Sequence, residues 1–297
     1  MGKIGITLKP HAYTPEAFAY QKYLEAKGWQ VRLAEDCALD PNNDVNIYFM
    51  GTRPFWKKKQ GCAKEVHEYQ SLSVPRYPRL KDGIKKIINR KPDGRIFLNQ
   101  YVQRALNFRD HIPSIQRDMG IDETLFQTPD LNPLYDVVYA GSVTGRVGLI
   151  QTILKLAHKG FKILLVGELS SDDLCQVKHP NITLTGKVSR DELPKLYRQC
   201  RAGLNYTPDI YPFNMQTSTK TLEYLASGLN VISNKYEWIV QFCNHHDYQP
   251  IWLSDELCID ELDQKIGNLP NMHEYSWGMI LQSSNFEYFL QNMLSGG

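Results

Sequence analysis

The segment from Tyr206 to Asn234 constrains the fold of this chain more than any other part of the sequence. It begins at the end of an apolar strand, crosses a polar loop, enters a short helix at residues 220–226 and returns as a strand at 230–233. Gly228 follows the helix, where a left-handed C-cap favours glycine. A strand, a polar loop and a helix N-terminus in this order are typical of anion sites, because unpaired N–H groups and the helix dipole attract negative charge.

Polar side chains gather at the start of this predicted helix. Ser218 and Thr219 can donate hydroxyl hydrogen bonds to an anion, and Lys220 can supply a positive charge. Glu223 lies one turn further along, on the helix face that carries Lys220. The same spacing is that of an ordinary surface ion pair between Lys220 and Glu223, so both interpretations stay open.

Three segments resemble one known family. The run KTLEYLASGLNVI, which begins at Lys220, is similar to the donor-binding signature of GT-B glycosyltransferases of the retaining family four (group 1), where a Glu begins an E-A-(M/L)-A-x-G-x-P-V-I run. GIDETLF, which begins at Gly120, resembles the G-V-D-x-x-x-F segment that closes their N-terminal domain, and Ser276-Trp277 resembles the Ser-Trp before their last helix. The three matches follow the family's order.

The resemblance implies an α/β fold of the GT-B type, with two Rossmann-like doubly wound domains that face each other across a cleft. We expect an acceptor-binding domain over residues 1–128 and a donor-binding domain over 134–277, with a C-terminal helix at 278–297 that crosses back to the first domain. The alternation of strands and helices at the start of the chain independently favours a doubly wound parallel sheet. No G-x-G-x-x-G follows the first strand, so a conventional dinucleotide site is not expected.

Local signals place several elements. The first domain is predicted to open with a strand at 3–9, a helix that begins at Thr14-Pro15-Glu16, and strands at 29–34 and 45–50. In the second domain, Ser189 and Glu192 have the spacing of a capping box at the start of a helix. Residues 76–91 are predicted to form a basic helical stretch.

The resemblance also implies how a nucleotide-sugar would be bound. The turn at Gly141 and Ser142 is expected to face the donor diphosphate. The family's usual Arg after the first glycine is Ser142 here, so Arg146 is expected to supply the charge. Lys187 and Val188 are expected to read the nucleotide base through their backbone.

Further roles follow from the same resemblance. Ser218, Thr219 and Lys220 are expected at the diphosphate, and Glu223 at the nucleotide ribose. His67 matches a His that faces the transferred sugar, so catalysis is expected from His67, Arg146 and Lys220. The sequence has no Asp-x-Asp, and cations with a helix dipole can neutralise a leaving diphosphate. We therefore expect no metal site and no cofactor apart from the UDP- or GDP-sugar co-substrate.

One position departs from the family's pattern. The family pairs two glutamates, the first of which contacts the donor sugar, but Met215 stands eight residues before Glu223. Asp209, in the loop upstream, is an alternative for that contact. The departure leaves the transferred sugar and the stereochemical outcome open.

The distribution of charge and the spacing of the cysteines indicate possible surface partners and a cellular compartment. Residues 1–126 contain 21 Lys and Arg against 14 Asp and Glu, whereas the rest of the chain is acidic. A basic first half fits peripheral contact with a membrane or another anionic partner, or equally a solvated surface. Its densest cluster, Trp56-Lys57-Lys58-Lys59, suits a lipid headgroup, a phosphate-bearing acceptor or an exposed loop. The six cysteines show no C-x-x-C spacing, which favours reduced thiols in the cytoplasm.

These observations predict a glycosyltransferase that moves a hexose to a glycan, lipid-linked or protein-linked acceptor. A non-catalytic module that binds a sugar-nucleotide or a glycan is the alternative, because of Met215. A GT-B sugar-nucleotide epimerase fits the matched segments less well. Nucleic acid is not an expected partner, since no base-stacking motif accompanies the basic half.

Overall fold

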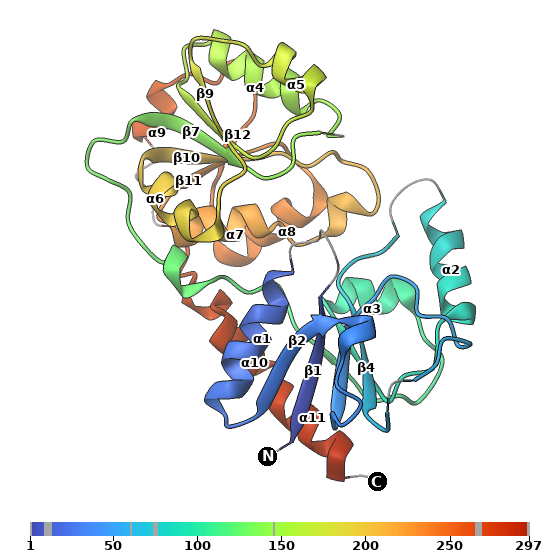
Figure 1. The fold of residues 1–297 in the computed structure, drawn as a ribbon. Helices are drawn as coiled ribbons and strands as arrows, with labels where there is room; N and C mark the ends of the chain where they lie inside the picture. The colour runs from blue at the N-terminus through green and yellow to red at the C-terminus, as the bar shows by residue number, and fades with distance from the viewer. Residues whose placement is uncertain are drawn as a thin grey trace. The chain divides into compact units, whose positions relative to one another are not determined.

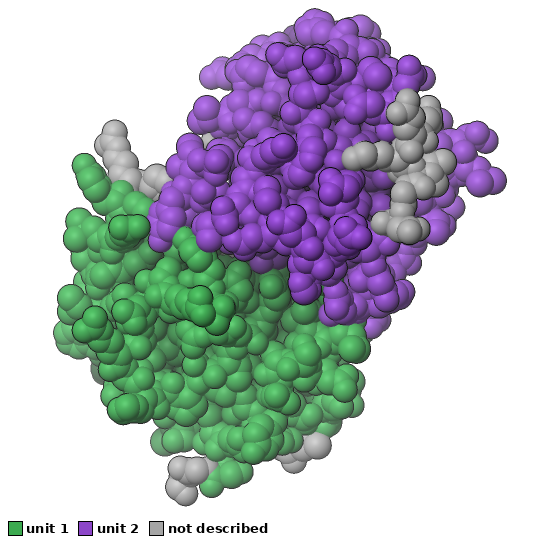
Figure 2. All heavy atoms as spheres, turned by 180° about the vertical axis from the view of Figure 1, so that it is seen from behind, with its two compact units in different colours: residues 1–120, 275–297 green, residues 121–274 purple. Residues whose placement is uncertain are grey.

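The chain folds into two compact units, described here from a computed structural model. The structure describes residues 2–8, 14–59, 61–73, 77–144, 146–264 and 269–295. Unit 1 comprises residues 1–120 and 275–297, and unit 2 comprises residues 121–274 (Figures 1 and 2). Each unit contains its own parallel sheet, so the predicted pair of doubly wound α/β units is confirmed.

Unit 1 contains a parallel sheet of six strands in the order β2-β1-β3-β4-β5-β6. The chain adds β2 on one side of β1 and β3 on the other, and this change in the strand order is typical of a doubly wound sheet. β4 carries the sequence KEVHEY, whose charged residues had given no strand prediction. The strands are β1 (Lys3–Leu8), β2 (Gln30–Glu35), β3 (Val45–Phe49), β4 (Lys64–Tyr69), β5 (Gly94–Phe97) and β6 (Ser114–Gln116).

Helices α1 (Pro15–Ala26), α10 (Trp277–Ser283) and α11 (Phe286–Ser295) cover one face of this sheet with apolar side chains. α1 begins at its N1 proline as predicted, although Thr14 makes no side-chain cap bond. Helices α2 (Pro78–Ile88) and α3 (Gln100–Leu106) pack against each other elsewhere in unit 1 (Figure 1). The predicted C-terminal helix is thus two helices, α10 and α11, and residues 296–297 lie outside the described residues.

A buried ion pair lies within this apolar core. Arg117 donates to the Glu68 carboxylate and to the Tyr20 hydroxyl, and that hydroxyl donates to Glu68 at 2.8 Å. All three side chains are buried, and burial raises the pKa of Glu68 although Arg117 opposes the shift. The pair is satisfied by hydrogen bonds, as a charge inside an apolar core must be.

Unit 2 repeats the architecture, with the strand order β12-β11-β10-β7-β8-β9. Its strands are β7 (Tyr135–Ala140), β8 (Ile163–Val166), β9 (Ile182–Gly186), β10 (Cys200–Asn205), β11 (Asn230–Ser233) and β12 (Ile251–Trp252). Its helices are α4 (Leu149–His158), α5 (Ser171–Gln176), α6 (Leu193–Arg198), α7 (Thr219–Ala226), α8 (Glu237–His246) and α9 (Asp260–Gln264). The neighbours β7 and β10 form its topological switch point, where ligands bind in sheets of this order.

The boundary between the units differs from the one set by the sequence. The sequence predicts residues 121–128 in the first domain, but they belong to unit 2. Gln127 N donates to Ala226 O at 3.3 Å, and the Ser227 hydroxyl donates to Leu125 O at 3.0 Å. These bonds to the C-terminal end of α7 hold the segment in unit 2.

Two further features concern the cysteines and the possibility of a membrane-spanning helix. All six cysteines are free thiols. Within the described residues, no helix combines the length and the apolar character that crossing a bilayer requires.

Candidate functional site

A pocket of about 370 Å³ lies in unit 2 at the carboxyl ends of β7 and β10. It therefore opens at the switch point of the sheet and beside the first turn of α7. Its lining comes from the turn after β7, the loop after β10 and the start of α7. The lining residues are Ser142, Arg146, Asn205, Tyr206, Thr207, Pro208, Phe213, Gln216, Thr217, Ser218, Thr219 and Lys220.

The start of α7 is held in place by Ser218. The Ser218 hydroxyl donates to Asn205 Oδ1 at 2.8 Å and accepts from Thr221 N at 3.3 Å. Asn205 is in turn anchored by the hydroxyls of Ser233 and Tyr236. The hydroxyl predicted to meet an anion thus serves as the helix cap in this structure. The first N–H groups of α7, which no helical carbonyl can satisfy, remain at the pocket.

Lys220 lies across the turn that follows β7. Gly141 has φ +128°, and a Cβ there would lie 3.1 Å from both Cε and Nζ of Lys220. The ammonium group also lies 5.3 Å from the centre of the Tyr139 ring. Glycine at position 141 therefore allows both the backbone conformation and the close passage of the lysine.

Arg146 supplies a second positive charge to the pocket. Its Nη1 donates to Tyr206 O at 3.4 Å. Among the described residues, neither Arg146 nor Lys220 forms an ion pair with a carboxylate. Burial, together with the charge of Arg146, lowers the pKa of Lys220 to about 8, although Glu223 opposes the shift. Two uncompensated cations at a helix N-terminus are suited to a polyanionic ligand.

Glu223 is buried, does not line the pocket and is held by two partners. Arg190 Nη2 donates to Glu223 Oε1 at 3.0 Å, and the Tyr197 hydroxyl lies 3.4 Å from Oε2. The Lys220–Glu223 surface pair that the spacing allowed is thus replaced by the pair with Arg190. Arg190 is not predictable from the sequence, because no local spacing connects position 190 to position 223.

The remaining predicted donor-site residues lie in different surroundings. Ser142 and Thr219 line the pocket. Lys187 and Val188 follow β9 and do not line it; Lys187 is exposed and Val188 is half-buried. Asp209, the alternative to the missing glutamate, is exposed, accepts a hydrogen bond from Asn214 and is also outside the lining.

His67 belongs to unit 1, on strand β4, and is fully buried. Its Nε2 lies 3.9 Å from Glu65 Oε2, and neither ring nitrogen has a hydrogen-bond partner among the described residues. Burial lowers the pKa of His67, which favours the neutral ring, although Glu65 opposes the shift. Contact with a substrate would require the ring to become exposed.

Comparison with known proteins gives this pocket a context. Residues 146–269, which include most of the pocket, match a family model described as glycosyl transferase-like. Among curated proteins, a tethering factor for nuclear proteasome, STS1, from Fusarium vanettenii is 32% identical over 84 residues. That match covers 27% of this chain and 28% of the curated protein, so the chain spans less than a third of its length.

Solved structures are similar over the whole chain. AviGT4, a glycosyltransferase involved in avilamycin A biosynthesis, has a TM-score of 0.63 at 10% identity and is matched over 100% of this chain and 99% of its own. Anabaena Alr3699/HepE, solved with UDP-glucose, has a TM-score of 0.62 at 11% identity, with the same coverage of both chains. The β-glucosyltransferase of phage T4, solved with its UDP-glucose substrate, has a TM-score of 0.55 at 15% identity, with coverages of 99% and 98%.

These comparisons confirm the resemblance to GT-B glycosyltransferases. At such identities the structural similarity shows the fold. The family match covers residues 146–269, the part of the chain that contains most of the pocket. The chain therefore has the GT-B fold, with the candidate site in its second unit.

Proposed function

We propose that this protein is a glycosyltransferase that transfers a hexose from a nucleotide-sugar to a glycan, lipid-linked or protein-linked acceptor. One observation carries the proposal: Arg146 and Lys220, two cations without a carboxylate partner in the described part of the chain, meet the N-terminus of α7 in a pocket at the switch point of unit 2. The glycosyl transferase-like match over residues 146–269 supports it. A UDP-sugar is our first choice of donor, since two structurally similar proteins were solved with UDP-glucose.

In the proposed reaction, an acceptor hydroxyl oxygen forms a bond to the anomeric carbon of the sugar while the bond between that carbon and the diphosphate breaks. The hydroxyl proton passes to the leaving phosphate, on which negative charge develops as the bond breaks. Arg146, Lys220 and the first N–H groups of α7 stabilise that charge, and Glu223 accepts hydrogen bonds from the ribose. Removing one such preorganised donor costs about 3–4 kcal/mol of transition-state stabilisation in comparable sites. Because these groups supply positive charge themselves, we propose a metal-independent reaction, and we propose retention of configuration by analogy with the family.

The contact to the donor sugar needs a substitute for the glutamate that Met215 replaces. Gln216 and Thr217 follow Met215 directly and line the pocket, whereas Asp209 does not. We propose that polar atoms of Gln216 or Thr217 take part in this contact.

A thermal-shift panel of UDP-, GDP-, ADP- and CMP-sugars tests the donor. A ligand that binds only the folded state raises the melting temperature by mass action, so one nucleotide class should give a saturable rise. If none of the four does so, the proposed donor class is wrong.

The alternative function is a module that binds a nucleotide-sugar without catalysis, which Met215 and the buried His67 favour. Slow hydrolysis of the bound donor separates the two, because only an enzyme releases free nucleotide. Loss of hydrolysis in His67→Ala with an unchanged melting temperature would support a catalytic role for His67. Loss together with a lower melting temperature would indicate a role in the core of unit 1.

A further inference from the structure

Helix α2 in unit 1 turns its apolar side outward. Leu80, Ile84 and Ile87 are 63%, 46% and 80% exposed, although their spacing places them on one side of the helix. We call these three residues the α2 stripe. Tyr77, the residue before the helix, is exposed as well. Surface helices normally bury such a stripe in the core.

The opposite side of α2 is polar and faces the protein. The buried carboxylate of Asp82 accepts a hydrogen bond from Ser73 N at 3.1 Å. Asp82, Lys85 and Lys86 line a small cavity together with Tyr69 and other residues of unit 1. The polar side is therefore the one that unit 1 uses for packing, and packing within unit 1 leaves the α2 stripe uncovered.

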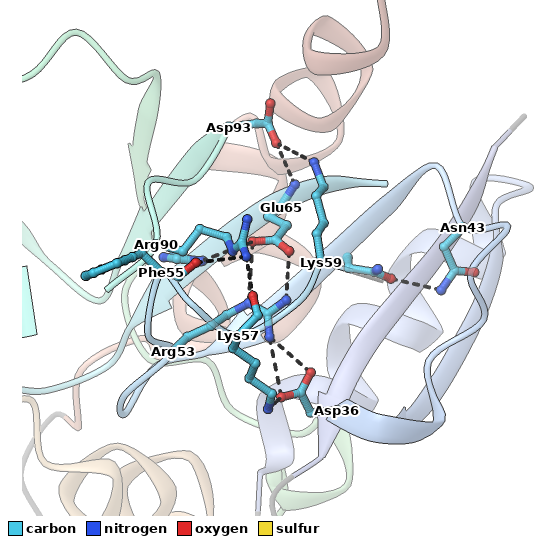
Figure 3. A network of polar contacts seen from close by, with 11 residues as sticks. Asp36, Asn43, Arg53, Phe55, Lys57, Lys59, Glu65, Arg90 and Asp93 are labelled. Carbon is cyan, nitrogen blue, oxygen red and sulfur yellow. Dashed lines mark hydrogen bonds and ion pairs between the residues drawn. The ribbon is translucent and has the colours of Figure 1, made fainter. Parts of the chain in front are cut away.

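An exposed aromatic pair adjoins the end of α2. Phe55 N donates to Ile88 O at 2.9 Å, and Arg90 N donates to Arg53 O at 2.8 Å, which fixes this segment against the helix. Arg90 Nη2 also donates to Phe55 O at 3.2 Å (Figure 3). Phe55 and Trp56 are 63% and 64% exposed, and their rings form an edge-on pair 4.9 Å apart. An exposed aromatic pair therefore lies next to the C-terminal end of α2.

Positive charges flank this surface. Arg79 and Lys81 are exposed at the two borders of the α2 stripe. Of the lysines after Trp56, Lys57 pairs with Asp36 and Lys59 with Asp93 (Figure 3). Lys58 has no ion-pair partner among the described residues.

We propose that the α2 stripe and the Phe55–Trp56 pair dock on an anionic lipid bilayer. Aliphatic side chains insert below the headgroups, cations meet acidic lipids, and tryptophan favours the interface. Charge complementarity selects this occupant, because a second copy of the chain would bring the same cations together. The proposal does not rest on the donor pocket, which lies in unit 2.

Vesicle co-sedimentation tests the docking surface with the full-length protein. Vesicles of phosphatidylcholine alone are compared with vesicles in which about 30% of the lipid is anionic phosphatidylglycerol, which gives a strong negative surface potential. Three variants are assayed alongside the wild type: Leu80→Ser/Ile84→Ser/Ile87→Ser, Arg79→Glu/Lys81→Glu, and Leu131→Ser/Leu134→Ser/Tyr288→Ser. The last removes three exposed apolar side chains elsewhere and serves as the matched control.

The wild type and the control should bind the anionic vesicles, and the stripe variant should lose at least about tenfold in partitioning. The charge variant should lose at least about tenfold at low salt, and the wild type should weaken at high salt. Equal binding to both vesicle types, or full binding by the stripe variant, overturns the proposal. So does binding to a DNA duplex instead of vesicles, or a dimer in size-exclusion that only the stripe variant abolishes.

Because every substituted side chain is exposed, the variants should keep the melting temperature of the wild type. Measuring it in parallel checks that they fold. Vesicle binding is measured without nucleotide, so its failure is distinguishable from failure of the proposed glycosyl transfer.

Discussion

Gly120 lies so close to the indole of Trp277 that a Cβ on the glycine would come within 2.3 Å of Trp277 Cδ2. The two residues come from two of the segments that suggested a GT-B glycosyltransferase, and they meet inside unit 1. Trp277 also packs edge-on against Tyr20, with ring centres 6.2 Å apart. These two motif matches therefore reflect packing of the C-terminal helices on the sheet of unit 1.

Gly120→Ala should destabilise unit 1 by about 1–3 kcal/mol, the usual cost of overpacking a filled core. Gly278→Ala is the matched control, because a Cβ there meets nothing within 4 Å and alanine favours the helix. Thermal unfolding should show a lower melting temperature for the first variant only. Equal melting temperatures would show that the indole has room to move.

Arg117→Met should destabilise the protein strongly, because it leaves the Glu68 carboxylate buried without its cation. Breaking a buried pair from one side costs about 3–5 kcal/mol. Glu68→Leu/Arg117→Met should recover most of that loss, since apolar replacements of both partners are often tolerated. Arg198→Met, which breaks the exposed pair with Asp130, should cost less than about 1 kcal/mol. A double variant as unstable as Arg117→Met would contradict this account.

UDP binding should weaken as the pH rises. The Lys220 pKa of about 8 lies above neutrality, so the ammonium is charged at pH 7 and is lost as the pH rises through that value. A bound diphosphate favours the charged form, so affinity should fall about tenfold by pH 9. Lys220→Arg should remove this dependence, and any loss shared by both proteins belongs to the ligand. An identical profile for both would exclude Lys220 as the titrating group.

Glu223 is predicted to recognise the ribose, so its effect should depend on the ligand. Glu223→Ala should weaken UDP binding about tenfold, the worth of hydrogen bonds to a charged group. Pyrophosphate has no ribose, so its affinity should not fall. Equal losses for UDP and pyrophosphate would mean that Glu223 acts by holding Arg190 or the helix.

Local signals predicted much of the fold and part of the site. The Ser189–Glu192 capping box forms as expected, and Gly228 ends α7 in the left-handed region. Both depend on residues within a few positions of each other. The turn at Gly141 and the start of α7 at Lys220 meet at one pocket because parallel strands place their carboxyl ends together.

Other features depend on partners distant in sequence. Strand β4 was missed because its charges looked exposed, whereas Glu65 is neutralised by Arg53 and Glu68 by Arg117. The periodicity of α2 cannot tell which side faces the protein, since that is decided by Ser73 and the cavity beneath Asp82. Arg190 was missed for the same reason, because its partner lies 33 positions away.

In the proposed complex, Arg146 and Lys220 hold the diphosphate of a nucleotide-sugar at the N-terminus of α7. Calorimetric titration of UDP tests it with wild type, Arg146→Met/Lys220→Met, and Lys162→Met/Lys178→Met as a control that removes two exposed lysines of the same unit. Two lost charge-assisted bonds should weaken binding at least about a hundredfold in the first variant, and the control should bind as the wild type does. Unchanged UDP affinity in Arg146→Met/Lys220→Met would contradict the account.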